Sequence, residues 1–426
     1  MSLSLYTIII VNLKYRFDRV LIIIAIVLTS CTNKAPTSSS SPTPSPATAI
    51  ETPKAPIATP ITSSPVVTAP ASPAVTNSTS SDVYQVIDEA QKPKFTTQSK
   101  NLFKTAQLPN SKVQFNPLDL LAVLASTRQY FQDQSASDPD IQRPGILAAE
   151  GVTVPKVLET LDFMIDTLQS DIEREQPIRL QDPKFINDNF KTIEWTAFNP
   201  EIKDEKRLRI TKYAVFTHLG SRTRTTEFNA GIYALKPNAG SEQLRLKHSK
   251  QDALADIYEP GGKEHGKVEP LAYLNRGGLE SALMEGTILI KFTDGTSDYF
   301  NVDKNNGSPY VKGVEPSKQK RYWYFKKVDN IKGYGRTIET KISIKPGVTF
   351  AGDVLNIGLG KMVVTEQSID GKKQLHLGIV ADTGGAFLPN LHQLDFLAGV
   401  FTNNTEYVSQ VKAMPDYAKA YILVKR

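Results

Sequence analysis

The stretch Val380–Gly399, VADTGGAFLPNLHQLDFLAG, holds two aspartates, Asp382 and Asp395, thirteen positions apart. The first opens an Asp-Thr-Gly triplet after two apolar residues, which is how pepsin-type proteases present a catalytic carboxylate. A two-lobed protease of that type needs a second such triplet, and the sequence has none. A single-lobed one has its triplet near the start, whereas only 44 residues follow Asp382, and Gly385 replaces the usual Ala or Ser. The two aspartates therefore indicate a different chemistry.

Length and composition indicate a soluble globular protein with room for two or three domains, because the 426 residues are 40% hydrophobic and 22% charged. The net charge of +6 and the pI of about 9.0 would favour an anionic partner or matrix. Spread over this length the charge is a weak field, so an uncharged partner fits as well. The sequence has no Cys-x-x-Cys pair and no His-x-x-His spacing, and we expect no metal and no cofactor.

The first 31 residues have the features of a bacterial lipoprotein signal peptide. Lys14, Arg16 and Arg19 precede the apolar run 20–28, which is too short to cross a bilayer but suits the hydrophobic part of a signal peptide. The following LTSC ends at Cys31 and matches a lipobox, in which the thiol accepts a diacylglyceryl group before cleavage. We therefore predict lipidation at Cys31 and a location in the bacterial cell envelope, on the periplasmic face of the outer membrane. A short anchor helix with an incidental cysteine is the alternative.

The rest of the chain divides into a linker, a helical part and a β part. Residues 32–81 are almost all Pro, Ser, Thr and Ala, and this segment has too little apolar surface to fold, so it is predicted to be a disordered linker. Apolar residues at three- and four-residue steps predict helices over 117–132 and 153–173. Beyond residue 192, short alternating runs predict strands, and Asp294-Gly295 predicts a hairpin turn.

The stretch that holds the two aspartates resembles the C-terminal 3D domain of the membrane-bound lytic murein transglycosylase A family. Other segments resemble further motifs of this family, so that the resemblance runs from about residue 117 to residue 426. The matching residues of the 3D motif are Asp382, Gly384, Gly385, Ala386, Asp395, Phe396 and Gly399. The further matching segments are 210–214, 284–300, 302–310, 343–348 and 412–426.

Several departures from the family pattern mark a divergent member. Two extra residues separate the aspartates, and Phe387-Leu388-Pro389 replaces an Ile-Lys-Gly. Lys212 and Ala214 replace a Gly and a Tyr of one strand motif, and Ile288 replaces a Gly of another. These departures leave an alternative open, in which the chain is a catalytically impaired lipoprotein that binds peptidoglycan or another polysaccharide.

The resemblance implies a mainly β fold with two domains. Residues 82–216 and 329–426 would form helices and a double-psi β-barrel of the 3D type. Residues 217–328 would form a smaller inserted β domain, and a glycan would bind in the groove between the two. Short N-terminal helices would precede the barrel.

The activity that the resemblance implies is lytic cleavage of the β-1,4 bond between MurNAc and GlcNAc in peptidoglycan. The 6-hydroxyl of the MurNAc attacks its own anomeric carbon and leaves a 1,6-anhydroMurNAc end without the use of water. Ordinary glycosidases need two carboxylates, but here the substrate supplies the nucleophile, so one carboxyl can serve as acid and then as base. The expected partner is the peptidoglycan glycan strand and not a nucleic acid, and the protein is expected to be a monomer.

By motif position the acid and base is Asp395. Its pKa must be raised by burial or by a nearby negative charge if it is to donate a proton near neutral pH. The alternative roles are structural: a loop cap for Asp395, a backbone hydrogen bond in the glycine turn for Asp382, and core packing for the strand residues. The expected supporting residues are Asp382, Thr211 and Tyr213, and the expected substrate-binding residues are Glu285, Thr287, Gly384 and Gly385.

The segment KQKRYWYFKK, residues 318–327, interleaves basic and aromatic side chains. Three roles fit this pattern: a strand with its aromatic face in the core, a surface that stacks on sugars, and a contact to nucleic acid through phosphates and bases. Export of the protein would disfavour the third.

Overall fold

The computed structural model describes residues 83–238, 240–369 and 372–426. The signal peptide predicted over 1–31, its Cys31 and the linker predicted over 32–81 lie outside these ranges. Within them, no helix has both the length and the apolar composition that crossing a membrane would require.

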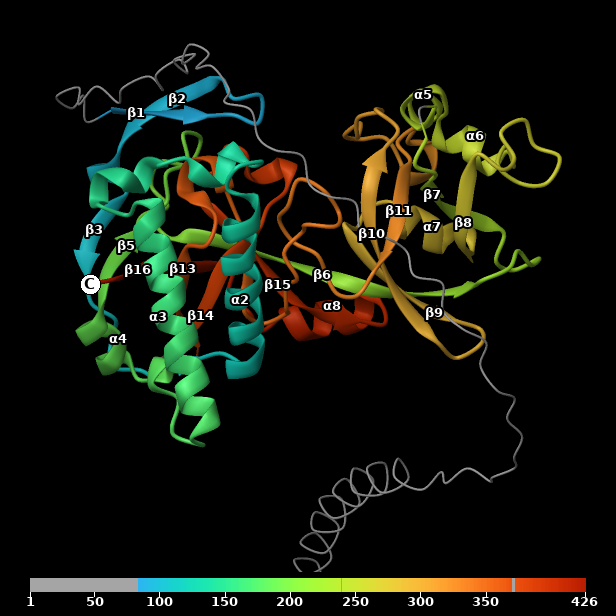
Figure 1. Ribbon diagram of the computed structural model, residues 1–426. Coiled ribbons are helices and arrows are strands. Elements are labelled where there is room, and N and C mark those ends of the chain that lie inside the picture. The colour runs from blue at the N-terminus through green and yellow to red at the C-terminus, as the bar shows by residue number, and fades with distance from the viewer. Residues whose placement is uncertain (1–82, 239, 370–371) are drawn as a thin grey trace, which may run out of the picture. The chain divides into compact units, whose positions relative to one another are not determined.

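The two predicted helices are present, as α2 (Pro117–Gln134) and α3 (Val154–Glu173) (Figure 1). The side chain of Asn116 accepts hydrogen bonds from two backbone N–H groups at the start of α2, and Pro117 occupies its first position. Short helices before the barrel are not confirmed, because α2 and α3 have 18 and 20 residues and strands come before them. Those strands are β1 (Val83–Ile87), β2 (Pro93–Gln98), β3 (Phe103–Ala106) and β4 (Val113–Gln114).

Six strands form a closed ring. The ring runs β6–β15–β12–β14–β13–β16 and returns to β6, because Tyr417 and Ala418 of β16 pair with Arg209 and Leu208 at the start of β6. β6 is parallel to β15 and β12 is parallel to β14, whereas the other neighbours are antiparallel. The bounds are β6 (Leu208–Ser221), β12 (Thr349–Ala351), β13 (Met362–Ile369), β14 (Lys372–Asp382), β15 (Gln393–Phe401) and β16 (Tyr417–Lys425).

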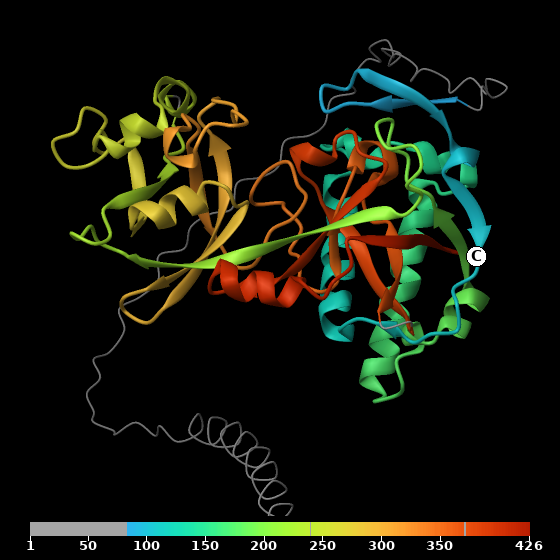
Figure 2. The ribbon, with the colours of Figure 1, turned by 180° about the vertical axis from the view of Figure 1, so that it is seen from behind.

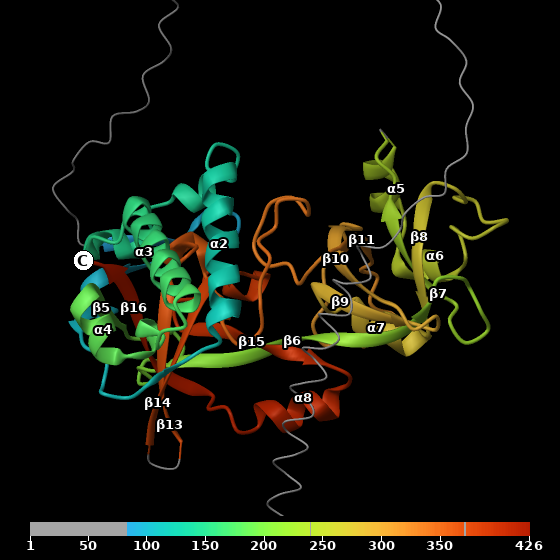
Figure 3. The same cartoon turned by 60° about the horizontal axis from the view of Figure 1, so that its bottom comes forward.

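The helices cover the barrel through one apolar core (Figure 3). α3 buries Val157, Leu161, Met164 and Leu168, which recur at three- and four-residue steps and therefore lie on one face of the helix. This face packs against β16, and α2 packs against β14. Outside the ring, β5 (Phe190–Trp195) pairs with β16 and β3 pairs with β5. The remaining helices near the barrel are α4 (Pro183–Asn189) and α8 (Asn404–Val411).

A second sheet includes the C-terminal end of β6. The strand leaves the barrel after Phe216, and residues 217–220 pair with β9, so that one continuous strand belongs to both sheets (Figure 2). This sheet has the order β11–β10–β9–β6–β8–β7. Its strands are β7 (Ala230–Leu235), β8 (Val268–Leu274), β9 (Thr287–Phe292), β10 (Ser297–Asn305) and β11 (Trp323–Val328). Its helices are α5 (Ser241–Lys247), α6 (Lys250–Leu254) and α7 (Arg276–Ala282).

The predicted hairpin turn at Asp294-Gly295 joins β9 to β10. Gly295 has φ +85, a conformation that glycine adopts without strain. The second sheet has its own core, whose buried residues lie between Ala230 and Phe325 in the sequence. The buried residues of the barrel core lie up to Val215 and from Ile331 onward. The domain limits of 82–216 with 329–426 and 217–328 remain a prediction.

Candidate active site

The two aspartates of the opening motif flank one residue of the barrel. Ala351 of β12 pairs with Asp382 of β14 on one side and with Asp395 of β15 on the other. Neighbouring strands lie about 4.8 Å apart, which places the Cα atoms of the two aspartates roughly 10 Å from each other. The loop between them makes a short helical turn at Gly385–Phe387, and Asp395 follows it on β15, where it pairs with Ala351.

Both aspartates line a cavity of about 600 Å³ between the barrel and the second sheet. The barrel contributes one wall and the second sheet contributes the other, while residues 331–341 lie along the connection between them. The residues that carry chemistry on the barrel side are Tyr213, Asp382 and Asp395, and those on the opposite side are Thr287, Asn301 and Arg321. The cavity therefore has the position that the resemblance implied for a glycan groove.

The carboxylate of Asp382 is held by two donors. The Tyr213 hydroxyl donates to Oδ2 at 2.7 Å, and the backbone N–H of Thr383 donates to Oδ1 at 2.8 Å. Burial raises the pKa of Asp382 to about 6, while these two donors and the ammonium group of Lys341 act to lower it. Burial and the same carboxylate raise the pKa of Tyr213, which keeps this hydroxyl a donor. Donors to both oxygens favour the ionised form of Asp382.

The carboxyl of Asp395 has a different environment. Its Oδ1 atom is buried and has no hydrogen-bond partner among the described residues. Burial raises the pKa of Asp395 to about 6, and the positive charges of Lys212 and Arg209 oppose this rise. A buried carboxyl oxygen without a donor favours the protonated form. The cavity thus pairs a fixed carboxylate with a carboxyl group that can hold a proton.

The predicted supporting residue Thr211 lies beside Asp395 but outside the cavity wall. It pairs with Asp395 across β6 and β15, and its hydroxyl donates to the carbonyl oxygen of Leu394 at 3.3 Å and accepts from Gln393 at 2.9 Å. The wall of a second hollow of about 470 Å³ includes Thr211 together with Tyr407. Its role in the site remains a prediction.

Three of the predicted substrate-binding residues line the cavity. Gly384 and Gly385 form part of the barrel wall, and Thr287 lies opposite. The carboxylate of Glu285, in contrast, does not line it: Oε1 lies 3.1 Å from Nε2 of His218, and Oε2 accepts from the backbone N–H of Phe216 at 3.2 Å. Whether any of them binds sugar remains a prediction.

A polar relay that sequence reasoning missed runs from the connecting segment to the wall formed by the second sheet. Nζ of Lys341 donates to Oδ1 of Asn301 at 2.7 Å, and Nδ2 of Asn301 donates to the Thr287 hydroxyl at 2.7 Å. Lys341 and Asn301 belong to no motif of the sequence, and their positions follow from the pairing of β10 with β9 and from the loop that precedes β12. No residue pattern could have assigned them.

The segment 318–327 divides between core and cavity. Tyr322, Tyr324 and Phe325 are buried in the second core, as the strand interpretation predicted. Trp323 and Arg321 line the cavity instead. The interleaving of basic and aromatic residues in the sequence was the pattern that had raised the possibility of a binding surface here.

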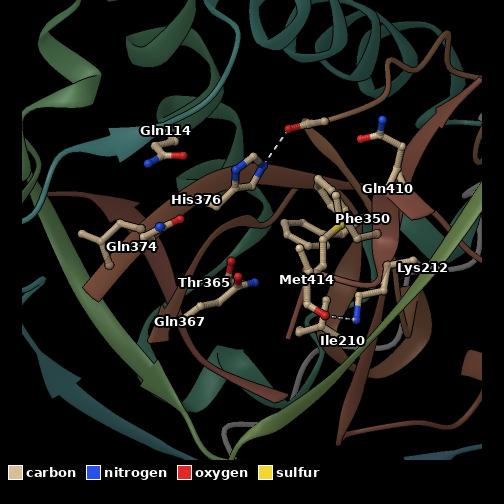
Figure 4. A pocket seen from close by; sticks show the side chains of 15 residues that line it. Gln114, Ile210, Lys212, Phe350, Thr365, Gln367, Gln374, His376, Gln410 and Met414 are labelled. Carbon is tan, nitrogen blue, oxygen red and sulfur yellow. Dashed lines mark hydrogen bonds between the residues drawn. The ribbon is translucent and has the colours of Figure 1, made fainter. Parts of the chain in front are cut away.

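A further cavity lies at the barrel strands but away from the two aspartates. It measures about 390 Å³ and is lined by Phe350, Met414 and several glutamines, with His376 and Lys212 at its edge (Figure 4). No aspartate or glutamate lines it in the described part of the chain, and Lys212 is engaged with the carbonyl oxygens of residues 414 and 415. Among the described residues, no group of three His, Cys, Asp or Glu side chains is arranged to hold a metal ion. Asp382 and Asp395 line the larger cavity instead.

The structure is similar to solved lytic transglycosylases. A membrane-bound lytic murein transglycosylase from Agrobacterium tumefaciens matches 76% of this chain and 98% of its own, at 16% identity and a TM-score of 0.52. E. coli MltA with bound chitohexaose matches 76% and 94%, at 16% identity and a TM-score of 0.47. MltA from Neisseria gonorrhoeae matches 76% and 96%, at 14% identity and a TM-score of 0.44. No family model matches the sequence, and no curated protein matches it.

The likeness to the Agrobacterium structure establishes the fold. The chain is mainly β, with a double-psi β-barrel and a smaller β domain, which confirms the fold class that the sequence predicted.

Proposed function

We propose that this chain is a lytic transglycosylase that cleaves the MurNAc–GlcNAc bond of peptidoglycan, with Asp395 as general acid and then base. The observation that carries the proposal is the pair of carboxyl groups in one cavity. Asp382 has two donors, whereas one buried oxygen of Asp395 has no donor among the residues that the structure describes. The fold shared with the Agrobacterium transglycosylase supports the same class of reaction.

The proposed reaction needs one proton donor and no water. Asp395 gives its proton to the glycosidic oxygen, the bond from that oxygen to the anomeric carbon of MurNAc breaks, and GlcNAc leaves with a free hydroxyl. Oxygen 6 of the same MurNAc then bonds to the anomeric carbon and returns its proton to Asp395. The carboxyl ends in its starting state, so no cofactor is consumed.

Asp382 is assigned a supporting role in this scheme. Its donors Tyr213 and Thr383 favour its ionised form and fix its position. In this scheme its negative charge stabilises the positive charge that develops at the anomeric carbon. Burial raises the pKa of both carboxyls to about 6. The assignment of the two roles therefore rests on the hydrogen bonds, because Asp382 has two donors and Oδ1 of Asp395 has none among the described residues.

The lipoprotein signal peptide and the lipid on Cys31 complete the proposal. They place the enzyme in the cell envelope, within reach of the wall. A protein of the same fold that binds glycan without cutting it is the alternative, and the departures at Phe387–Pro389 and Lys212 are its grounds.

Purified full-length protein is expected to release 1,6-anhydro muropeptides from isolated sacculi. Mass spectrometry distinguishes these products from the hydrated ends left by a hydrolase, because the anhydro end lacks one water. Hydrated ends alone would replace the proposed mechanism with hydrolysis. Retention on sacculi without any soluble product would support the glycan-binding alternative.

The rate is expected to depend on pH with an optimum near 6. The carboxyl that acts as acid must carry its proton, and the pKa of Asp395 is about 6, so kcat/KM should fall about tenfold per pH unit above that value. Ionisation of Asp382 is needed as well, so the rate should also fall on the acid side. The measurement is product formation from sacculi between pH 4 and 8. A rate that keeps rising to pH 8 would contradict the assignment of Asp395 as acid.

A further inference from the structure

The cavity contains a guanidinium group without a carboxylate partner. Arg321 lies between two aromatic rings, 4.2 Å from the centroid of Trp323 and 5.2 Å from that of Tyr310. Nη2 donates to the carbonyl oxygen of Leu283 at 2.8 Å and contacts the sulfur of Met284 at 3.2 Å. Within the described residues, Arg321 forms no ion pair with an aspartate or a glutamate. Its other nitrogens are available to a ligand.

The other two cations of the cavity, Lys332 and Lys341, donate to partners of their own. Lys332 forms an ion pair with Asp329 at 2.7 Å, and Lys341 donates to the amide oxygen of Asn301. The two acidic residues of the cavity, Asp382 and Asp395, are on the barrel wall. Among the described residues no aspartate or glutamate pairs with Arg321, so its positive charge is available to an anionic occupant of the cavity.

The geometry points to a carboxylate-binding position at Arg321 that selects acidic glycans, and this inference rests on the proposed function. The two ring contacts and the hydrogen bond to Leu283 restrict the guanidinium group, whose paired N–H groups match the two oxygens of a carboxylate. Each MurNAc of a wall glycan carries a lactyl group, which ends in a carboxylate in strands without peptide. Where a stem peptide is attached, the peptide supplies carboxylates of its own. GlcNAc has neither, so an oligomer of GlcNAc alone would leave Arg321 unpaired.

The test compares the binding of three glycans by calorimetry, with Asp395→Asn as background so that nothing is cleaved. The probes are chitohexaose, a peptide-free MurNAc–GlcNAc hexasaccharide, and the same hexasaccharide with its carboxylates converted to methyl esters. Arg321→Met is expected to weaken binding of the acidic hexasaccharide about 10-fold or more, because a hydrogen bond to a charged group is lost. Its effect on chitohexaose and on the methyl ester is expected to be less than about threefold, since neither offers a charge to the guanidinium.

Two further variants separate the charge from the packing. Arg321→Lys keeps the charge without the paired N–H groups and is expected to fall between the wild type and Arg321→Met. Arg222→Met is the matched control, because Arg222 also lies over a ring, 3.9 Å from Phe292, but pairs with Asp294 and Asp298 and does not line the cavity. It should leave the binding of all three probes unchanged.

A fourth probe identifies the source of the carboxylate. If a hexasaccharide with stem peptides loses affinity on Arg321→Met as the peptide-free strand does, the position also accepts a peptide carboxylate. If only the peptide-free strand loses affinity on Arg321→Met, the position at Arg321 binds the carboxylate of the lactyl group. Equal losses for neutral and acidic glycans, or no loss for either acidic strand, would overturn the inference while leaving the proposed function intact. Failure of the unsubstituted cavity to bind any glycan would overturn both.

Discussion

Replacement of Asp395 by Asn is expected to lower the formation of 1,6-anhydro ends about 10³- to 10⁴-fold. The amide can neither donate the proton that the leaving oxygen needs nor accept the proton of the 6-hydroxyl, so both halves of the proposed reaction lose their catalyst. Binding of glycan should persist, because the side chain keeps its size. The measurement is the single-turnover rate on sacculi, with products identified by mass spectrometry.

The matched control is Asp188→Asn. Asp188 is an exposed carboxylate that pairs with Lys184 at 2.7 Å and does not line the cavity. It should retain the wild-type rate. Full activity of Asp395→Asn would place the acid elsewhere, with Asp382 as the next carboxyl to test.

Replacement of Asp395 by Asn is also expected to stabilise the protein at neutral pH. The pKa of Asp395 rises from its usual 3.8 to about 6 on folding, so the folded state binds more protons than the unfolded state between these values. Stability of the wild type should therefore fall as pH rises from about 4 to about 6 and then level off. Asparagine does not ionise, so the variant keeps this stability. Its free energy of unfolding at pH 7 should exceed that of the wild type by about 1–2 kcal/mol, after allowance for the partial exposure of Asp395. Urea unfolding of both proteins at pH 4 and pH 7 measures it, and an equal difference at the two pH values would contradict it.

Local sequence patterns were sufficient to predict two helices, one turn and the motif that contains the two aspartates. The apolar spacing along 117–132 and 153–173 placed two helices, and Asp294-Gly295 placed a turn, because these signals depend on residues close in sequence. The family motif similarly singled out Asp382 and Asp395. What it could not supply is that both flank Ala351, since this depends on the order of β14, β12 and β15 in the ring.

The opposite wall of the cavity was harder to predict for the same reason. Glu285 and Thr287 are two residues apart, yet Thr287 lines the cavity and Glu285 faces His218, which lies 67 positions away. Asn301 and Lys341 meet across 40 positions without any shared motif. Pairing between distant segments decides which polar side chains reach the cavity, and one sequence carries no direct signal of it.

Replacement of Asp138 by Ala is expected to destabilise the protein by about 2–4 kcal/mol and to impair the site as well. Asp138 is fully buried and accepts from the hydroxyls of Tyr130 at 2.7 Å and Tyr334 at 2.9 Å. Alanine leaves both hydroxyls without an acceptor. Tyr334 also lines the cavity, and its backbone N–H donates to Ala381, the residue before Asp382.

Two variants distinguish the general loss of stability from the effect on the site. Tyr130→Phe removes the hydrogen bond that lies away from the cavity and is expected to cost about 1 kcal/mol without changing kcat/KM. Tyr334→Phe removes the bond on the cavity side, so the same cost should be accompanied by a lower kcat/KM, because the wall beside Asp382 loses its support. Urea unfolding and the rate on sacculi, both at 25 °C, give the two quantities. Each variant removes one hydroxyl donor from the carboxylate of Asp138, and the two differ only in whether that donor belongs to a residue of the cavity wall. Equal rates for the two variants would therefore show that Asp138 stabilises the fold without positioning the site.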